Sequence, residues 1–360
     1  MQVCHAPDAG QLVNTTQNYV NAYDGSTTAF AAPNDLSSLM KTYYDTELLE
    51  NARPNLIHAQ FARKQPLPKG RGKKVEWRKF NTLADASALT EGVIPTGQKF
   101  GQSSMTASIL QYGTYLTVSD QLELHAIDNV ILSATEELGA SAGTTQDKLV
   151  RDTLAAGTTV QYCDKVSAAG AHTAAETRAG MDTTSKLTPT EVNKAVTTLK
   201  KLKAPTINGK YVAIIHPSVS YDLRENKEWI EAHKYAAVTP LFTGEIGELH
   251  GVRFIETTEA KIWNNNTCPV KTAAGSGGTP AATYYSVYST LFLGKDAFGM
   301  IDPEGGGLEM IVKSKEQAGG PLNQFSTLGY KFSTATKILY QDRMVRVESL
   351  SEYSGTDEAN

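Results

Sequence analysis

The strongest local chemical signal in the sequence is a cluster of cations. Between positions 63 and 79 the only acidic residue is Glu76, whereas the basic residues are Arg63, Lys64, Lys69, Arg71, Lys73, Lys74, Arg78 and Lys79. Such a cluster favours docking onto an acidic partner, either phosphate or the acidic face of another protein, including a second copy of this chain. It is equally typical of a strand edge that charge protects from aggregation. Both interpretations stay open.

No motif for phosphate, nucleotide or acyl chemistry is complete. Gly209-Lys210 and Gly294-Lys295 are followed by Tyr211 and Asp296, so neither forms a phosphate-binding loop, which needs Ser or Thr there. GSGG at 275–278 differs from the nucleophile elbow G-x-S-x-G. The spaced glycines of 244–251 precede a strand and indicate turns. We therefore predict no catalytic residues, no cofactor and no enzyme.

The potential metal ligands are dispersed. The histidines lack the spacing of a metal site, and Cys4, Cys163 and Cys268 form no C-x-x-C pair, so we predict no metal and free thiols. His216, which precedes Pro217, could act as a general base, but a structural histidine bonded to the backbone is the favoured interpretation. Two carboxylate pairs are expected to be solvated: Glu136–Glu137 and Glu256–Glu259.

Composition bounds the class of protein. The chain has 360 residues and a formal net charge of −4, which argues against a surface built wholly to coat nucleic acid. At roughly 150 residues per domain, two domains or one elaborated domain are expected. No apolar run reaches the roughly 18 residues that span a bilayer, and no secretory signal is expected.

The cations lie within a segment whose residue pattern predicts a two-stranded ribbon. Val75 and Trp77 alternate with charged residues, and strand character resumes before Ser119, after a tip broken by Gly and Pro. An isolated two-stranded ribbon is marginally stable in water. We therefore expect the ribbon at 64–118 to lie on another surface, of its own domain or of a neighbouring copy.

The segments around this ribbon are of two kinds. Residues 1–38 are polar without a period, which indicates a disordered tail or an arm ordered by a partner, and a helix is expected from Asp35 to Pro54. The strongest helix signal spans 128–156, with Ser119 and Asp128 as candidate N-caps. We expect this helix to be a spine on which strands pack.

The second half mixes one clear helix with strands in hairpin-like order. Thr188, Pro189 and Glu191 form a capping-box pattern at a helix start. Strands are expected at 211–217, 251–257, 283–294 and 308–313 and in two final β-rich runs, with a flexible loop at 264–282. This order predicts the α+β class rather than a doubly wound parallel sheet.

Several motifs together resemble a known family. The runs NARPNLIHAQFARKQPLPKGRGKKVEWRKF, LTEGVIPTGQKF, QYGTYLTVSDQLELHAIDNVI, YVAIIHPSVSYDLR, LFTGEIGELHGVRFIET and GGPLNQFSTLGYKFSTATKILYQDRMVRVES are similar to major capsid proteins of tailed bacteriophages, in particular the N4-like coat protein family. The similarity spans roughly residues 36–350.

The resemblance implies the tailed-phage and herpesvirus capsid fold. Its expected parts are an N-terminal arm and helix (1–62), an extended loop (63–118), a peripheral domain with a spine helix (119–186), an axial domain (187–330), and C-terminal strands that return to the peripheral domain before an acidic tail (331–360).

The implied function is self-assembly into an icosahedral head around double-stranded DNA. The expected partners are copies of the chain in pentameric and hexameric capsomers, a decoration or cement protein, portal and scaffolding proteins, and DNA bound without sequence preference; no membrane is expected. The expected location is the virion, after assembly in the host bacterial cytoplasm. The residues predicted to contact neighbouring subunits, with Trp77 and Phe80 as apolar anchors, are Lys69, Arg71, Lys73, Lys74, Trp77, Arg78, Lys79 and Phe80.

Two alternatives belong to other classes. One is a soluble enzyme or ligand-binding module with a dispersed site, which a large apolar pocket with convergent polar groups would favour. The other is a minor or decoration protein of the head.

Overall fold

A computed structural model describes most of the chain after residue 56. The described residues are 57–70, 72–80, 83, 85, 86, 88, 89, 91, 92, 94, 97–125, 130–234, 245–272, 283–315, 322 and 324–360. The predicted N-terminal arm and its helix up to Pro54 lie outside them, as does Arg71. The chain divides into two compact units, one of Met1–Glu50, Tyr115–Glu137 and Met310–Gly329, the other of Asn51–Thr114, Leu138–Glu309 and Tyr330–Asn360.

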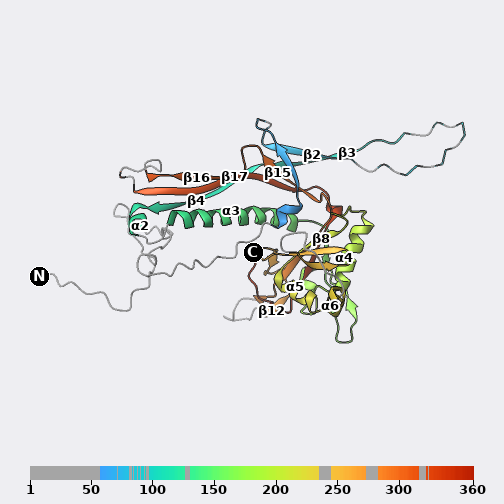
Figure 1. Ribbon diagram of the computed structural model, residues 1–360. Coiled ribbons are helices and arrows are strands. Elements are labelled where there is room, and N and C mark those ends of the chain that lie inside the picture. Colours follow the sequence, from blue (N-terminus) through green and yellow to red (C-terminus); the bar gives the residue numbers. More distant parts are fainter. Residues whose placement is uncertain are drawn as a thin grey trace, which may run out of the picture. The chain divides into compact units, whose positions relative to one another are not determined.

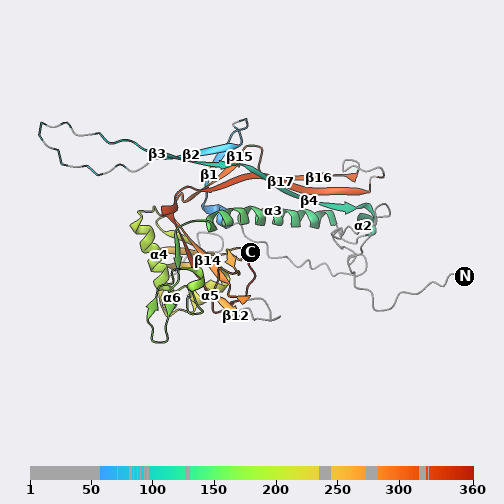
Figure 2. The same cartoon turned by 180° about the vertical axis from the view of Figure 1, so that it is seen from behind.

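A seven-stranded mixed sheet forms the centre of the larger unit (Figures 1 and 2). Its central strands are buried on both faces, which explains the continuous apolar sequence of β8, whereas β18 is equally buried but carries the paired Arg346 and Glu348. The order is β5 (Val160–Tyr162), β18 (Met344–Ser349), β14 (Val287–Leu293), β8 (Tyr211–Ile215), β10 (Val252–Glu256) and β9 (Glu245–Leu249), and β11 (Ile262–Trp263) also pairs with β14.

Three helices cover one face of this sheet (Figure 1): α4 (Pro189–Lys201), α5 (Pro217–Arg224) and α6 (Lys227–Lys234). The helix predicted at Thr188 is confirmed, but its capping box is wrong, because the Thr188 side chain makes no capping hydrogen bond. The Glu191 carboxylate instead accepts a 2.9 Å hydrogen bond from Gln161 Nε2 and lies 2.8 Å from Lys194 Nζ. A glutamine from a distant segment and a lysine from the next turn of the helix thus compete with the local cap for Glu191.

The long helix α3 (Val130–Ala155) confirms the helix predicted at 128–156. Its last turns pack against the other face of the seven-stranded sheet, where Val150 and Leu154 join Val212, Ile214 and Leu291 in one buried cluster. The short helix η1 (His58–Phe61) contributes Phe61 and the preceding Ile57 to the same cluster, and β15 (Phe298–Pro303) contributes Phe298 and Met300. In the part of the chain that the structure describes, no helix is long and apolar enough to cross a membrane.

A buried arginine joins the end of α3 to the sheet. Arg346, on β18, donates from Nη1 to the carbonyl oxygens of Ala155 and Gly157, the latter at 3.1 Å. These carbonyls lie at the helix end, where no intrahelical N–H is left to pair with them and where a cation is favourable. The Nε of Arg346 donates to the buried carboxylate of Glu348 at 2.9 Å. Arg178 also donates to that carboxylate, at 2.6 and 2.7 Å.

The second sheet contains β1 (Arg63–Leu67), β15, β17 (Phe325–Ile338) and β16 (Glu309–Lys313) in that order, and β4 (Leu110–Ser119) pairs with β17. Gly113 lets β4 approach β17 closely, because a Cβ there would lie 2.4 Å from the Tyr330 carbonyl oxygen. β1 and β4 therefore belong to a sheet. Only β2 (Lys74–Phe80) and β3 (Gln102–Ser108) form the ribbon, which corrects the prediction of one ribbon across 64–118.

In the smaller unit, α2 (Asp120–His125) follows β4 directly. Ser119 Oγ accepts a 3.4 Å hydrogen bond from the Leu122 amide, so Ser119 caps α2 and not the long helix for which it was a candidate N-cap. The other candidate, Asp128, lies outside the described residues. The Asp120 amide donates to the Gln324 carbonyl at 2.9 Å, and Ser326 Oγ donates to the Val118 carbonyl at 3.4 Å. These bonds hold the end of β4 beside the start of β17.

Smaller elements complete the described chain. The two final strands, β17 and β18, lie in different sheets and so do not return together to one sheet. The balance of helices and antiparallel strands confirms the α+β class. The remaining elements are β6 (Lys165–Val166), β7 (His172–Thr173), η2 (Arg178–Gly180), β12 (Val270–Thr272), β13 (Thr283–Tyr284) and η3 (Gln341–Arg343).

The polar segment after β18 is bound to the larger unit. The Asp357 carboxylate accepts hydrogen bonds from the Tyr288 hydroxyl at 2.6 Å, from Ser218 Oγ at 3.2 Å and from Ser354 Oγ. Burial and the neighbouring carboxylate raise the pKa of Tyr288 well above its ordinary value, so this tyrosine stays a hydrogen-bond donor. The acidic tail predicted here is therefore a hydrogen-bonded part of the fold.

Replacing Arg346 with Met should strongly destabilise the larger unit. The change leaves the carbonyls at the end of α3 unpaired and removes one of the two cations of Glu348, and breaking a buried pair costs about 3–5 kcal/mol. Urea unfolding of the purified subunit measures the loss. Arg343→Met is the control, since Arg343 is half-buried and donates one hydrogen bond, to the Lys295 carbonyl. Equal losses in the two variants would contradict this role of Arg346.

Asp357 should make stability depend on acid. Burial opposes ionisation of this carboxyl, but hydrogen bonds from Ser354, Tyr288 and Ser218 outweigh it and hold its pKa below the ordinary value. Such a group stabilises the fold above its unfolded pKa of about 4, and that stabilisation is lost as pH falls through the folded pKa. We expect Asp357→Asn to cost about 1 kcal/mol at neutral pH, and less below about pH 3. A cost that is the same at both pH values would refute this.

Candidate functional site: the β2–β3 ribbon and its support

The ribbon is regular and has two different faces. β2 and β3 pair antiparallel from Lys74 opposite Ser108 to Phe80 opposite Gln102, and they lie side by side in both views (Figures 1 and 2). Because side chains alternate along a strand, Val75 and Trp77 are on one face and the exposed residues of β2 are on the other. The exposed face carries charge next to the Ser and Thr side chains of β3.

The other face packs on the chain's own body. The Trp77 ring is 8% exposed and clusters with Ile301, Ala335 and Leu339. It fits because residue 299 is glycine: a Cβ there would lie 3.2 Å from Trp77 Cζ2. This corrects the prediction that Trp77 anchors a neighbour, since its apolar surface is already covered within the subunit.

The predicted contact cations fall into two groups. Lys79 is directed toward its own chain, with Nζ 4.9 Å from the centre of the Tyr340 ring and 3.7 Å from Asp342. The remaining predicted cations that the structure describes are exposed. Of these, only Arg78 has an ion-pair partner among the described residues, Glu76 at 3.7 Å. The exposed cations are Lys69, Lys73, Lys74 and Arg78, and Arg71 lies outside the described residues.

The region beyond the paired strands is apolar as well as exposed. Phe80 stacks on Phe100 with ring centres 4.8 Å apart, and both are exposed. Leu89 is 76% exposed and Ile94 is 93% exposed. We call Phe80, Leu89, Ile94 and Phe100 the apolar tip. Of these, only Phe80 is among the residues predicted from the sequence; the signal for the others is the presence of apolar side chains in a segment broken by Gly and Pro.

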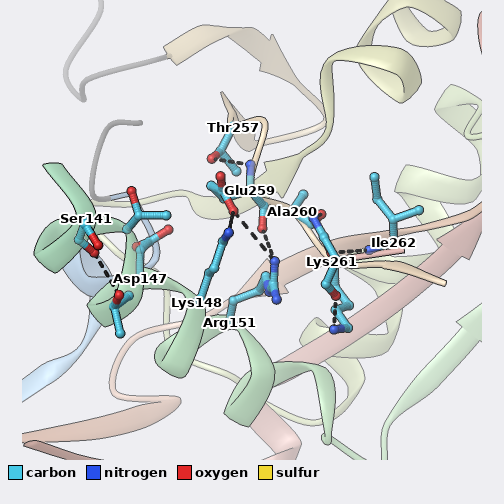
Figure 3. Close-up of polar contacts among 12 residues, drawn as sticks. Ser141, Asp147, Lys148, Arg151, Thr257, Glu259, Ala260, Lys261 and Ile262 are labelled. Carbon is cyan, nitrogen blue, oxygen red and sulfur yellow. Dashed lines mark hydrogen bonds and ion pairs between the residues drawn. The ribbon is translucent and has the colours of Figure 1, made fainter. Parts of the chain in front are cut away.

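The body that carries the ribbon is held together by ion pairs along α3. In Figure 3 Lys148 and Arg151 extend from α3 toward Glu259, whose carboxylate lies 3.3 Å from Lys148 Nζ. Arg151 donates to the Glu259 carbonyl at 3.2 Å. Asp147, on the same helix, accepts two hydrogen bonds from the buried His58. One comes from the His58 ring Nδ1 at 2.6 Å and the other from the His58 backbone amide at 2.8 Å. These contacts connect α3 with the segment before β1 and with the loop before β11.

Other candidate groups have structural roles. His216 Nδ1 accepts a 3.2 Å hydrogen bond from the Ser218 amide at the start of α5, which confirms the structural interpretation, and burial lowers the pKa of this histidine. Glu256 accepts from Ser220 Oγ at 3.2 Å and pairs with Arg224, so the prediction that Glu256 and Glu259 are simply solvated is wrong. Within the described ranges, no group of three His, Cys, Asp or Glu residues could hold a metal ion.

Comparison with known proteins finds a matching family and similar folds. Residues 40–318 match the family model described as phage capsid protein. The fold is similar to the capsid structure of cyanophage P-SCSP1u, with a TM-score of 0.58 and 16% identity over 94% of this chain and 100% of that one. It is also similar to the capsid of Ralstonia phage GP4, with a TM-score of 0.60 and 12% identity over 93% and 100% of the two chains. No curated protein matches the sequence.

The match to the family covers most of the chain and includes the ribbon, α3 and the seven-stranded sheet except for β18. The capsid structures share the fold over nearly their whole lengths. The role of this protein is that of a major capsid protein, the subunit of the phage head shell, and family and fold imply a structural rather than an enzymatic role. The chain belongs to the phage capsid protein family.

Proposed function

We propose that each subunit joins the shell by inserting its apolar tip and the exposed cations of its ribbon into a neighbouring copy. The apolar tip is the observation that carries this proposal. The body of the subunit supports the ribbon through Trp77, whereas Leu89 and Ile94 stay in water. Large apolar side chains at the end of a ribbon have no role in the isolated fold, so a partner surface is their natural environment.

The apolar contribution would be substantial. Burying a Leu, Ile or Phe side chain stabilises a contact by about 1.5–3 kcal/mol. Because the apolar tip and its receiving surface would be different parts of the same chain, the contact is heterologous, and repeated heterologous contacts close into rings. Pentameric and hexameric capsomers of an icosahedral head are such rings.

The cations would guide and align this contact. Lys69, Lys73 and Lys74 have no carboxylate partner among the described residues and are available to an acidic surface of a neighbour. Exposed charges change the rate and specificity of association more than its strength. Assembly should therefore slow as salt rises, since exposed charges are screened beyond about 10 Å at 0.1 M salt.

We also assign the expected parts of the capsid fold to this chain. The N-terminal arm and helix would be 1–62, the extended loop 63–118, the peripheral domain 119–186 with α3 as its spine, the axial domain 187–330 and the C-terminal strands and tail 331–360. On the resemblance of its sequence motifs, we also assign the chain to the N4-like group. Assembly would occur in the host cytoplasm with scaffolding, portal and decoration or cement proteins, around double-stranded DNA bound without sequence preference.

A charged apolar tip should stop assembly without unfolding the subunit. In the double variant Leu89→Asp and Ile94→Asp the changed side chains are already in water in the free subunit, so its free energy of unfolding should stay within about 0.5 kcal/mol of the parent. Negative-stain microscopy of the purified protein should then show no shells. Leu202→Asp, at the end of α4, is the control. Normal heads from the double variant would remove the apolar tip from the contact.

Charge reversal tests the cations separately. Changing Arg71, Lys73 and Lys74 together to Glu should leave a folded monomer that forms no shells, because three positive charges at the docking face become negative. Sedimentation and microscopy report the outcome. A variant with the same reversals at Lys200, Lys201 and Lys203, which are exposed around the end of α4, should assemble normally. If the ribbon variant also assembles normally, the cations have no docking role and serve only to protect the ribbon edge.

A further inference from the structure

A shallow groove on the larger unit is lined by polar and aromatic side chains that have no part in the proposed docking contact. Two adjoining hollows, of about 850 and 490 Å³, share Lys271 and Thr356. Their walls come from the segment before α4, from the β12–β13 hairpin and from the segment after β18. We call this the hydroxyl groove and define it by Thr183, Thr188, Lys271, Tyr285, Tyr353 and Thr356.

Some polar groups of the groove are paired within the protein, among them Thr184, Ser351 and Ser354, and others are not. The hydroxyls of Thr183, Thr188, Tyr285, Tyr353 and Thr356 have no hydrogen-bond partner among the described residues. A hydroxyl both donates and accepts, so these groups can pair with a ligand that does the same. Several unpaired hydroxyls facing one groove indicate a hydroxyl-rich ligand.

Aromatic rings line the same groove. Tyr353 is 70% exposed, and its ring contacts the ring of Tyr221, with centres 5.4 Å apart. Tyr285 lies beneath Lys271, whose Nζ is 5.9 Å from the ring centre. Fixed tyrosines with free hydroxyls offer an apolar face and a polar edge at once.

The charges exclude other classes of ligand. Lys186 pairs with Glu352 across the groove, which leaves Lys271 as the cation without a carboxylate partner among the described lining residues. Nucleic acid needs several such cations along its phosphates. The only aliphatic lining residues are Val166 and the buried Leu350, so the groove lacks the apolar centre of a protein interface or of a site for an apolar small molecule.

We propose that the hydroxyl groove binds a polysaccharide. Sugar rings present hydroxyls at their edges and C–H groups on their faces, and these match the free hydroxyls and the tyrosine rings of the groove. Tyr353 stacks against a sugar ring, and Tyr285 and Lys271 contact hydroxyls or a carboxylate of the polysaccharide. This site is separate from the ribbon and does not depend on the proposed docking contact.

The test is binding of the full-length protein, as free subunits and as assembled heads, to an array of purified bacterial surface polysaccharides. We expect binding to at least one of them. Tyr353→Ala should weaken that binding at least 10-fold and Lys271→Ala about 3-fold, at unchanged stability. Tyr115→Ala, a tyrosine on β4 that is 71% exposed, is the matched control and should bind like the parent.

Three outcomes would overturn the proposal. The first is that neither subunits nor heads bind any arrayed polysaccharide. The second is that Tyr353→Ala and Tyr115→Ala bind equally well. The third is that Tyr353→Ala prevents shell formation while polysaccharide binding by its subunits is unchanged, which would make the groove a contact between copies of this chain.

Discussion

Burial of the end of α3 is the constraint on which the larger unit depends. Val150 and Leu154 are fully buried against the seven-stranded sheet, and β15 of the second sheet contributes Phe298 to the same cluster. A helix that is apolar on one side needs a surface to cover it, and here residues of both sheets share that cover. The position of β15, against which the base of the ribbon packs, follows from this one apolar core.

Apolar burial is not directional, so polar contacts determine how α3 lies on its neighbours. Arg346 binds the last carbonyls of the helix, Arg151 binds the loop at Glu259, and Asp147 binds His58. Each contact satisfies a group that would otherwise be buried without a partner. Together with the apolar core they make a body rigid enough to carry a ribbon that could not be stable alone.

The ribbon has two parts, a base that packs on its own subunit and an exposed part that does not. Trp77 and Lys79 bind the parent body, whereas the apolar tip and the exposed cations are left for other surfaces. The base supports the ribbon within the subunit, and in the proposed contact the tip would gain its stabilisation from a neighbour. A capsid subunit needs both properties, because it must stay soluble as a monomer and still associate strongly when many contacts form together.

Local patterns were enough to predict several of the elements and the fold class. The apolar period of α3, the alternation of β2 and the unbroken apolar run of β8 depend only on residues near one another in sequence. The cation cluster and the order of the capsid motifs could be recognised in the same way. The capping box at Thr188 failed although it is local, because Gln161 and Lys194 compete for Glu191.

Which side chains are free and which are already paired was decided only by the tertiary structure. Trp77 needs Gly299 and Ala335 beneath it, and Glu259 needs Lys148 from α3. The two residues of the His58–Asp147 pair are 89 positions apart. Sequence periodicity reports the face on which a residue lies but not what covers that face, because the covering surface comes from distant segments whose packing depends on the whole core.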